Sequence, residues 1–162
     1  MTGSDAVSTT GSLGGLDWRR GTSITPAVRA LLDAKNVVVV SSHRKDGTIH
    51  AIPVWVDTDG EHVLLNSVAG RVWERNLSRE PNVTCTVVQS GNPYEFVEIR
   101  GRVVGRSLEE AEAHIHRLAK KYLDLDEYPW LRPEDTRVLY RIAPVSVFHM
   151  RPASTEMDAA GS

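Results

Sequence analysis

The chain has a single cysteine, Cys85, among its 162 residues. One thiol cannot form an intrachain disulfide, and this thiol lies in the apolar run 83–88, where a buried and inert cysteine is commoner than a reactive one. No apolar stretch is long enough for a transmembrane helix, and the first residues lack the basic-then-apolar order of a secretory signal. The sequence therefore predicts a cytoplasmic protein with no disulfide and no membrane partner.

An excess of charge of one sign is also missing. The formal net charge of -2 gives no general attraction for nucleic acid or an anionic membrane, so a bound anion must meet a local cluster of Lys and Arg. The histidines show no metal-ligand spacing, and His114 and His116 fall on different faces of a predicted helix. Nucleophile motifs and Gly-rich mononucleotide loops are absent as well. We therefore expect no nucleic-acid partner, no metal and no hydrolase chemistry.

The length and the composition, 41% hydrophobic and 25% charged, predict one globular domain. Both ends of the chain are rich in Gly, Ser, Thr and Ala. They offer little apolar surface to offset the entropy lost on ordering. We expect disordered tails at residues 1–21 and 153–162 and one working domain at residues 22–152.

Runs of β-branched residues separated by turn dipeptides dominate this domain. The runs cover residues 37–41, 48–57, 62–66, 83–88, 95–104 and 137–142, with 145–149 as an extension of the last. Asp46-Gly47 and Asp59-Gly60 lie between such runs and supply the positive φ angles that tight hairpin turns need. A small antiparallel β-barrel is favoured, because closing the sheet removes the edges that six open strands would expose.

Helices are few, so the predicted class is mainly β with some α. Thr25 is placed to cap a short helix that has Pro26 at its first position. Ser107 and Glu110 have the spacing of a capping box, which predicts the start of a longer helix. The apolar face of that helix comprises Leu108, Ala111, Ile115, Leu118, Ala119 and Tyr122. This face is expected to pack on the barrel.

The segment 66–81 carries the richest chemistry. It follows a predicted strand, contains Asn66, Ser67 and Gly70, and opens a short helix flanked by Arg71 and Arg75. Backbone N–H groups at a helix start and guanidiniums at this spacing are suited to holding a phosphate. The residues allow a second interpretation, a connecting helix whose arginines pair with nearby glutamates or with solvent.

The order of residues in this segment resembles the phosphate-binding segment of the pyridoxamine 5'-phosphate oxidase-like split β-barrel proteins, which bind FMN or the deazaflavin F420. The resemblance continues upstream in residues 50–56 and downstream in 92–94 and 97–103, and covers about residues 24–150. It implies a six-stranded antiparallel split β-barrel with a packed helix. It also implies a homodimer in which both chains contribute to each cofactor site. The pattern is most similar to the F420-dependent branch of the family.

The resemblance also implies site residues. Those matching the family's cofactor contacts are Ile52, Pro53, Val54 and Trp55 along the ring, and Asn66, Ser67, Arg71, Val72, Trp73, Arg75 and Asn76 near the phosphate and the sugar-like chain. Trp73 and Tyr94 are expected to border the substrate. A proline within a strand indicates an edge or an irregular ladder, so Pro53 is consistent with a ligand here, although the bare sequence also fits a plain barrel strand with Trp55 in the core or at a subunit interface.

Several residues keep alternative roles. Members of the F420 branch often carry Lys where this chain has Trp73. The tryptophan is expected to stack on a ring, to line the substrate pocket or to pack its helix against the protein. We assign Tyr128 and Trp130 to a barrel end or a dimer interface, although such aromatics also wall pockets. Lys45 and Arg79 are within reach of an oligoglutamate tail on F420, but an ordinary exposed charge is the simpler interpretation.

The function that the resemblance implies is an F420-dependent oxidoreductase. It would transfer a hydride between reduced deazaflavin and an unsaturated or conjugated small molecule, with the protein supplying orientation and electrostatics. One alternative keeps the fold and binds FMN, as an oxidase or a flavin reductase. Another is a non-catalytic protein that binds a cofactor or a tetrapyrrole.

Overall fold

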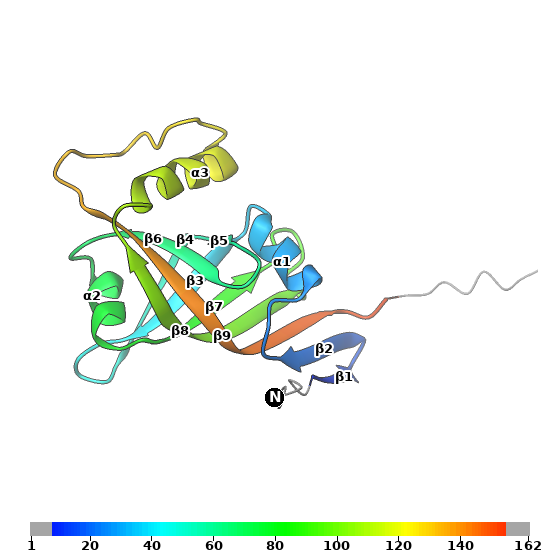
Figure 1. Cartoon of the computed structure of the whole chain (residues 1–162). Coiled ribbons are helices and arrows are strands. Elements are labelled where there is room, and N and C mark those ends of the chain that lie inside the picture. The colour runs from blue at the N-terminus through cyan, green and yellow to red at the C-terminus, as the bar shows by residue number, and fades with distance from the viewer. Residues whose placement is uncertain (1–7, 155–162) are drawn as a thin grey trace, which may run out of the picture.

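The computed structural model describes residues 8–154 and contains nine strands and three helices in this range (Figure 1). In chain order they are β1 (Thr9–Leu13), β2 (Leu16–Gly21), α1 (Pro26–Asp33), β3 (Val37–His43), β4 (Ile49–Trp55), β5 (Asp57–Thr58), β6 (Val63–Val68), α2 (Val72–Arg79), β7 (Asn82–Val88), β8 (Phe96–Ser107), α3 (Ala111–Leu123) and β9 (Arg137–Pro152). The predicted mainly β class is confirmed, and all six predicted strands are present. None of the helices in this range is long and apolar enough to cross a membrane.

The strands form one antiparallel sheet in the order β1-β2-β9-β8-β7-β3-β4, and β6 pairs with β9 and with β5. The sheet curls so that β4 and β6 face each other without pairing in the described part of the chain. The barrel is therefore split between these two strands. One edge of β4 has no strand partner there, and Pro53 lies on this strand, as a proline in a ladder requires.

Strand β9 is longer than the sequence suggested, because it absorbs both 137–142 and 145–149. Its first half pairs with β6 and its second half with β2 along the same edge. The pairing with β8 shifts register between Arg100 and Gly101, where Gly101 lies opposite Pro144. A β-bulge tolerates a proline, since the ladder is already interrupted there, so the strand continues through Pro144.

The barrel interior is filled by alternate residues of the strands, and α1 closes one end of it. Thr25 Oγ1 accepts the N–H of Val28 at 3.2 Å, so the predicted cap of α1 is confirmed. Val28 and Leu32 of α1 are fully buried in the same core as Val38 and Val40 of β3. Cys85 is also fully buried, as predicted, and burial raises the pKa of its thiol to about 12.

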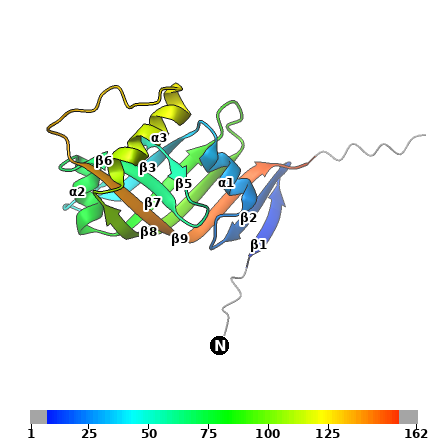
Figure 2. The ribbon, with the colours of Figure 1, turned by 45° about the horizontal axis from the view of Figure 1, so that its top comes forward.

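Helix α3 lies across one side of the barrel, over β6 and β9 (Figures 1 and 2). The capping-box prediction was wrong about its start. Ser107 ends β8 and its hydroxyl accepts the N–H of Glu110 in a turn, while the Glu110 carboxylate forms an ion pair with Arg141 instead of returning to the helix start. Leu108 is consequently exposed, and the helix begins at Ala111.

The prediction of a disordered tail at residues 1–21 was wrong for residues 9–21. Strands β1 and β2 form a hairpin that pairs with the second half of β9, and both views place it at the end of the barrel opposite α2. Trp18 stacks on Phe148 with ring centroids 6.1 Å apart. Backbone pairing and this contact order a segment that is poor in apolar residues. Residues 1–7 and 155–162, which fall in the two predicted tails, lie outside the described residues, and Ala153 donates a hydrogen bond to Gly15 O.

Candidate functional site

Helix α2 is held in place at its first turn by a buried carboxylate. Gly70 precedes the helix with a φ of 92°, a conformation that only glycine adopts without strain. Its N–H donates to Glu74 Oε2 at 2.9 Å, so Glu74 satisfies a backbone donor at the start of its own helix. Arg106 and Tyr140, from β8 and β9, donate to the other carboxylate oxygen. The turn that carries Arg71 is thereby attached to the barrel.

The opening between β4 and β6 contains a cavity of about 370 Å³, which we call the split cavity. Its lining comprises Val37, Ile52, Pro53, Val54, Trp55, Asn66, Arg71, Trp73, Ile115, Leu118, Tyr128, Trp130 and Arg137. Most of these side chains are aliphatic or aromatic, and the charged ones are both arginines. The chemistry of the lining suits a flat apolar group that carries an anion.

Arg137 is a buried positive charge in the lining of this cavity. It is only 7% exposed, yet no Asp or Glu of the described chain forms an ion pair with it. Nη1 donates to Asn66 Oδ1 at 3.3 Å, and the guanidinium carbon lies 4.6 Å from the centre of the Tyr128 ring. Nε has no hydrogen-bond partner among the described residues. A buried cation without a carboxylate partner in the described chain is suited to pairing with an anion that enters the cavity.

The second guanidinium of the split cavity belongs to Arg71. It lies at the N-cap of α2, is exposed, and likewise takes part in no ion pair within the described range. Arg71 and Arg137 come from different elements of the cavity lining, one from the N-cap of α2 and one from β9. The sequence also allowed Arg71 to pair with a nearby glutamate, and the structure shows no such pair among the described residues.

Aromatic rings form one wall of the split cavity. Trp55 stacks on Tyr122 with ring centroids 5.1 Å apart and an interplanar angle of 5°. Tyr128 meets the edge of Trp55, and Trp130 meets Tyr128 in turn. Both Tyr128 and Trp130 therefore line a cavity of the single chain, and their assignment to a dimer interface stays a prediction.

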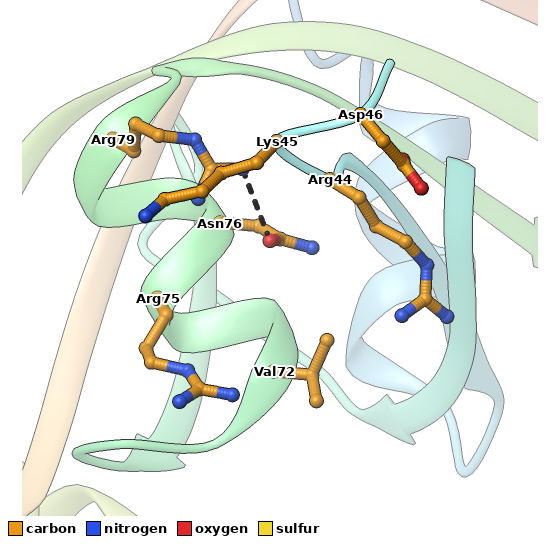
Figure 3. A pocket seen from close by; sticks show the side chains of 7 residues that line it. All are labelled: Arg44, Lys45, Asp46, Val72, Arg75, Asn76 and Arg79. Atoms are coloured by element: carbon orange, nitrogen blue, oxygen red, sulfur yellow. Dashed lines mark hydrogen bonds between the residues drawn. The ribbon is translucent and has the colours of Figure 1, made fainter. Parts of the chain in front are cut away.

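A second cavity of about 620 Å³ lies beside α2, and we call it the cationic cavity. It is lined by Arg44, Lys45, Asp46, Val72, Arg75, Asn76 and Arg79 (Figure 3). Arg44, Lys45 and Asp46 come from the turn between β3 and β4, and the other four residues come from α2. In the described chain, none of the basic side chains of this lining forms an ion pair. The cavity thus contains a local cluster of Lys and Arg side chains, which a chain of net charge -2 needs in order to bind an anion.

The two asparagines of the predicted segment both orient arginines. Asn66 Oδ1 accepts from Arg137, as described above. Asn76 Oδ1 accepts from Arg79 Nη2 at 3.2 Å, and its Nδ2 donates to the buried Ser42 Oγ at 3.0 Å (Figure 3). Most of the hydrogen-bonding capacity of both amides is therefore used inside the protein, and their effect on a ligand would be exerted through the guanidiniums.

The structure gathers most of the predicted site residues into the two cavities. The split cavity receives Ile52, Pro53, Val54, Trp55, Asn66, Arg71 and Trp73, and the cationic cavity receives Val72, Arg75 and Asn76. Ser67 lines neither, because its side chain is buried and its hydroxyl points to Val68 O. Tyr94 also lines neither and is 65% exposed in the turn between β7 and β8. That these residues bind a cofactor or a substrate stays a prediction.

Trp73, the departure from the F420 branch, is largely a core residue. It is 2% exposed and packs against Tyr140 with ring centroids 6.3 Å apart. Only a small part of the indole reaches the split cavity. Helix packing therefore accounts for most of its contacts, and the positive charge of the cavity comes from the arginines.

Sequence reasoning missed Arg44 and Arg137. Arg44 precedes the Asp46-Gly47 turn, and a basic residue in an exposed hairpin turn has no distinguishing pattern. Arg137 opens the last predicted strand, where its position gave no sign of burial. As for metals, no group of potential ligands gathers in the described part of the chain.

Comparisons with known proteins agree with this architecture. The profile of the pyridoxamine 5'-phosphate oxidase family matches residues 24–153. An F420 reductase superposes with a TM-score of 0.65 at 26% identity, over 74% of this chain and 94% of that protein. A pyridoxamine 5'-phosphate oxidase-like protein from Listeria innocua gives a TM-score of 0.54 at 25% identity, over 75% and 93% of the two chains.

More distant structures share the fold alone. HutZ, the heme storage protein from Vibrio cholerae, is 12% identical with a TM-score of 0.57, over 81% of this chain and 97% of that protein. No curated protein matched the sequence. The family match spans the whole barrel from the start of α1 to the end of β9, including every residue of both cavities. The chain therefore belongs to the pyridoxamine 5'-phosphate oxidase family of split β-barrel proteins.

Proposed function

We propose that the protein is an F420-dependent oxidoreductase that transfers a hydride between reduced deazaflavin and an unsaturated or conjugated small molecule. The observation that carries this proposal is the split cavity, where guanidiniums without carboxylate partners in the described chain lie among aromatic and aliphatic walls. A planar ring with an attached phosphate fits that combination of surfaces. The similarity to an F420 reductase supports F420 over FMN.

The residues of the split cavity divide between the parts of such a cofactor. Arg71 and Arg137 would hold the phosphate, since both line the cavity and neither guanidinium forms an ion pair in the described chain. The unpaired edge of β4, from Ile52 to Trp55, would run along the ring and present backbone groups to its polar rim. When bound, the deazaflavin would supply the hydride chemistry, and the protein orients it and excludes water.

The cationic cavity supports F420 in particular. The cofactor F420 carries an oligoglutamate tail, whereas FMN has none. Arg44, Lys45, Arg75 and Arg79 would meet the carboxylates of that tail, and Val72 of this cavity directly follows Arg71 of the split cavity along the chain. A ligand that occupied both cavities would pass over the start of α2.

Proton delivery is simple in this arrangement. The lining of the split cavity includes no Asp, Glu or His. A proton for the reduced product would therefore come from water, and the protein's own contribution is positioning and charge.

We further propose that the protein works as a homodimer. Val37, Ile49, Val88 and Val104 are each about half exposed on the adjacent strands β3, β4, β7 and β8, and a second copy would cover such side chains. The same copy would complete the wall of the split cavity beside the open edge of β4.

The test of the proposed function is a titration of the purified protein with F420 and, separately, with FMN, followed by tryptophan fluorescence. Trp55, Trp73 and Trp130 line the split cavity, so a ligand there quenches them, while Trp18 on the distant hairpin provides a constant signal. Trp55→Phe and Trp130→Phe should each reduce the change, and Trp18→Phe should leave it.

Each outcome of this titration has a clear meaning. Tight F420 binding with weak FMN binding supports the proposal and justifies a screen of reducible substrates. Tight binding of FMN alone means an FMN oxidoreductase. Tight binding with no turnover under any reductant favours a protein that stores a cofactor, and binding of neither ligand overturns the assignment.

A further inference from the structure

A line of polar side chains runs from the split cavity into the protein beneath α3. It begins with Arg137, passes through Asn66 and His114, and ends at Asp57, so that it joins β9, β6, α3 and β5. Asn66 is 9% exposed and His114 is fully buried. Buried polar groups of this kind need partners, and here neighbouring members of the line contact one another, while Ala111 O is a further acceptor for Asn66.

The orientation of the Asn66 amide is fixed by its neighbours. Its Nδ2 lies 2.8 Å from Ala111 O and 3.1 Å from His114 Nδ1, while its Oδ1 lies 3.3 Å from Arg137 Nη1. The opposite orientation would set the amide oxygen against a carbonyl oxygen and the amide nitrogen against a guanidinium. Only the observed orientation pairs donors with acceptors.

This orientation determines the tautomer of His114. Because Asn66 Nδ2 donates, His114 Nδ1 must accept, and the ring proton resides on Nε2. Nε2 lies 3.3 Å from Asp57 Oδ2 but makes no well-aligned hydrogen bond within the described chain, so that contact is electrostatic. Burial alone raises the pKa of Asp57, but His114, the N–H of Thr58 and nearby Lys121 together hold it below its usual value, so the carboxylate stays charged.

We propose that His114 is a positioning residue that acts through Asn66 to aim the Arg137 guanidinium into the split cavity. His114 does not line the split cavity, so it would not contact a ligand bound there. Together with Ala111 O, its Nδ1 holds the Asn66 amide in the orientation that leaves Oδ1 for Arg137. The inference rests on the proposed function to the extent that Arg137 is taken as the anion contact.

The experiment compares His114→Leu with His114→Asn. Leucine fills the space without an acceptor, whereas the asparagine oxygen can occupy the place of Nδ1 and restore the hydrogen bond from Asn66. His114→Leu should weaken F420 binding about tenfold, the value of one buried hydrogen bond, and His114→Asn should restore most of the affinity. The Arg137 Nε–H signal in a ¹H–¹⁵N spectrum, assigned by its loss in Arg137→Lys, should shift or broaden only in His114→Leu.

A matched control is Asn36→Leu. Asn36 is also a buried amide, 3% exposed, and it joins Leu31 O to the N–H of Ser90 away from this line. It should lower thermal stability and leave the Arg137 signal unchanged. An unchanged Arg137 signal in folded His114→Leu, or equal losses in both His114 variants, would overturn the positioning role.

One measurement needs no variant. The ring nitrogens of His114 in the wild-type protein should report an unprotonated Nδ1 and a protonated Nε2, and the reverse tautomer contradicts the inference even if His114→Leu does not fold. Failure of the wild-type protein to bind F420 overturns the proposed function only, because the Arg137 signal and the His114 tautomer are read without ligand.

Discussion

The hydroxyl of Tyr140 on β9 donates to Glu74 Oε1 on α2 over 2.8 Å, and both residues are buried. Arg106 donates to the same oxygen at 3.1 Å, and the N–H of Gly70 donates to the other. One carboxylate therefore joins the start of α2 to the two longest strands of the barrel. Because Arg71 lies between Gly70 and Glu74, this joint determines where the Arg71 guanidinium can reach.

The first prediction concerns Glu74→Gln. Burial alone raises the pKa of Glu74, but the hydrogen bonds from Gly70, Tyr140 and Arg106 outweigh it and hold the pKa below its usual value. A carboxyl with a lowered folded-state pKa stabilises the protein fully above its unfolded-state pKa, about 4.3, and loses that effect as the pH falls further. Glu74→Gln should therefore cost about 2 kcal/mol of unfolding free energy at neutral pH.

The measurement is urea unfolding of both proteins across the acid range. The difference in unfolding free energy should shrink as the pH falls below about 4.3. Glu61→Gln, at an exposed residue without an ion pair in the described chain, is the control and should change little at any pH. A difference that stayed constant with pH would mean that the charge of Glu74 does not matter.

The second prediction is that Arg137→Met separates stability from binding. Arg137 is buried without a carboxylate partner in the described chain, and a buried charge without such a partner destabilises the folded state. Methionine keeps much of the volume but leaves Asn66 Oδ1 without this donor, so the two effects should nearly cancel and the unfolding free energy of the ligand-free protein should change by less than about 1 kcal/mol. F420 affinity should fall by at least about tenfold, because a charge-assisted hydrogen bond is lost.

Thermal melts and F420 titrations of the same preparations check this pair of effects. Arg102→Met replaces an exposed arginine of β8 and should alter neither quantity. Loss of stability together with loss of affinity would instead identify Arg137 as a structural residue.

The barrel was predictable because its signals are local. The Asp-Gly turns and the β-branched runs each fix a hairpin within a few residues, and Thr25 with Pro26 fixes the start of α1. The β1–β2 hairpin was not predictable in this way. Its polar strands are ordered by pairing with β9 and by the contact of Trp18 with Phe148, which lie far apart in the sequence.

The site was predictable only where one segment carries it. Arg71 and Arg75 follow a strand within a recognisable order of residues, and both line cavities. Arg137 could not be found, because its burial depends on α3 and on the aromatic loop after that helix. His114 follows Ala111 at the spacing of a buried residue, but its partner Asn66 lies 48 residues away in the chain, so no local pattern indicates their contact.

The third prediction tests whether the cationic cavity distinguishes F420 from FMN. Arg75→Ala and Arg79→Ala remove guanidiniums that would meet the tail of F420, which FMN lacks. Each should weaken F420 binding several-fold, by about 0.5–1 kcal/mol for an exposed charge, and leave FMN binding unchanged. The loss should also be smaller at high salt, because screening already weakens exposed charge pairs.

Isothermal titration at low and high salt is the appropriate measurement. Arg132→Ala, at an exposed loop residue outside both cavities, is the control and should leave F420 binding as it was. Equal losses for F420 and FMN would place the cofactor phosphate, not the tail, in the cationic cavity.

The last prediction concerns the hydroxyl of Tyr122, which connects α3 to the barrel by hydrogen bonds. It donates to Asn36 O and accepts the N–H of Val56 at 3.1 Å, so Tyr122→Phe leaves two buried backbone groups without this partner. The loss should be about 1–2 kcal/mol of unfolding free energy at neutral pH. Tyr94→Phe, at an exposed ring, should cost almost nothing.

Alkaline pH provides a second check of the same hydroxyl. Burial raises the pKa of Tyr122 to about 12. The unfolded chain ionises near the ordinary value of about 10, so the contribution of the hydroxyl is complete below that pH and is lost as the pH rises toward the folded-state value. The wild-type protein should therefore lose stability more steeply than Tyr122→Phe across this range. Parallel curves for the two proteins would show that the hydroxyl is accessible to water, and that Tyr122 contributes to the attachment of α3 mainly by stacking on Trp55.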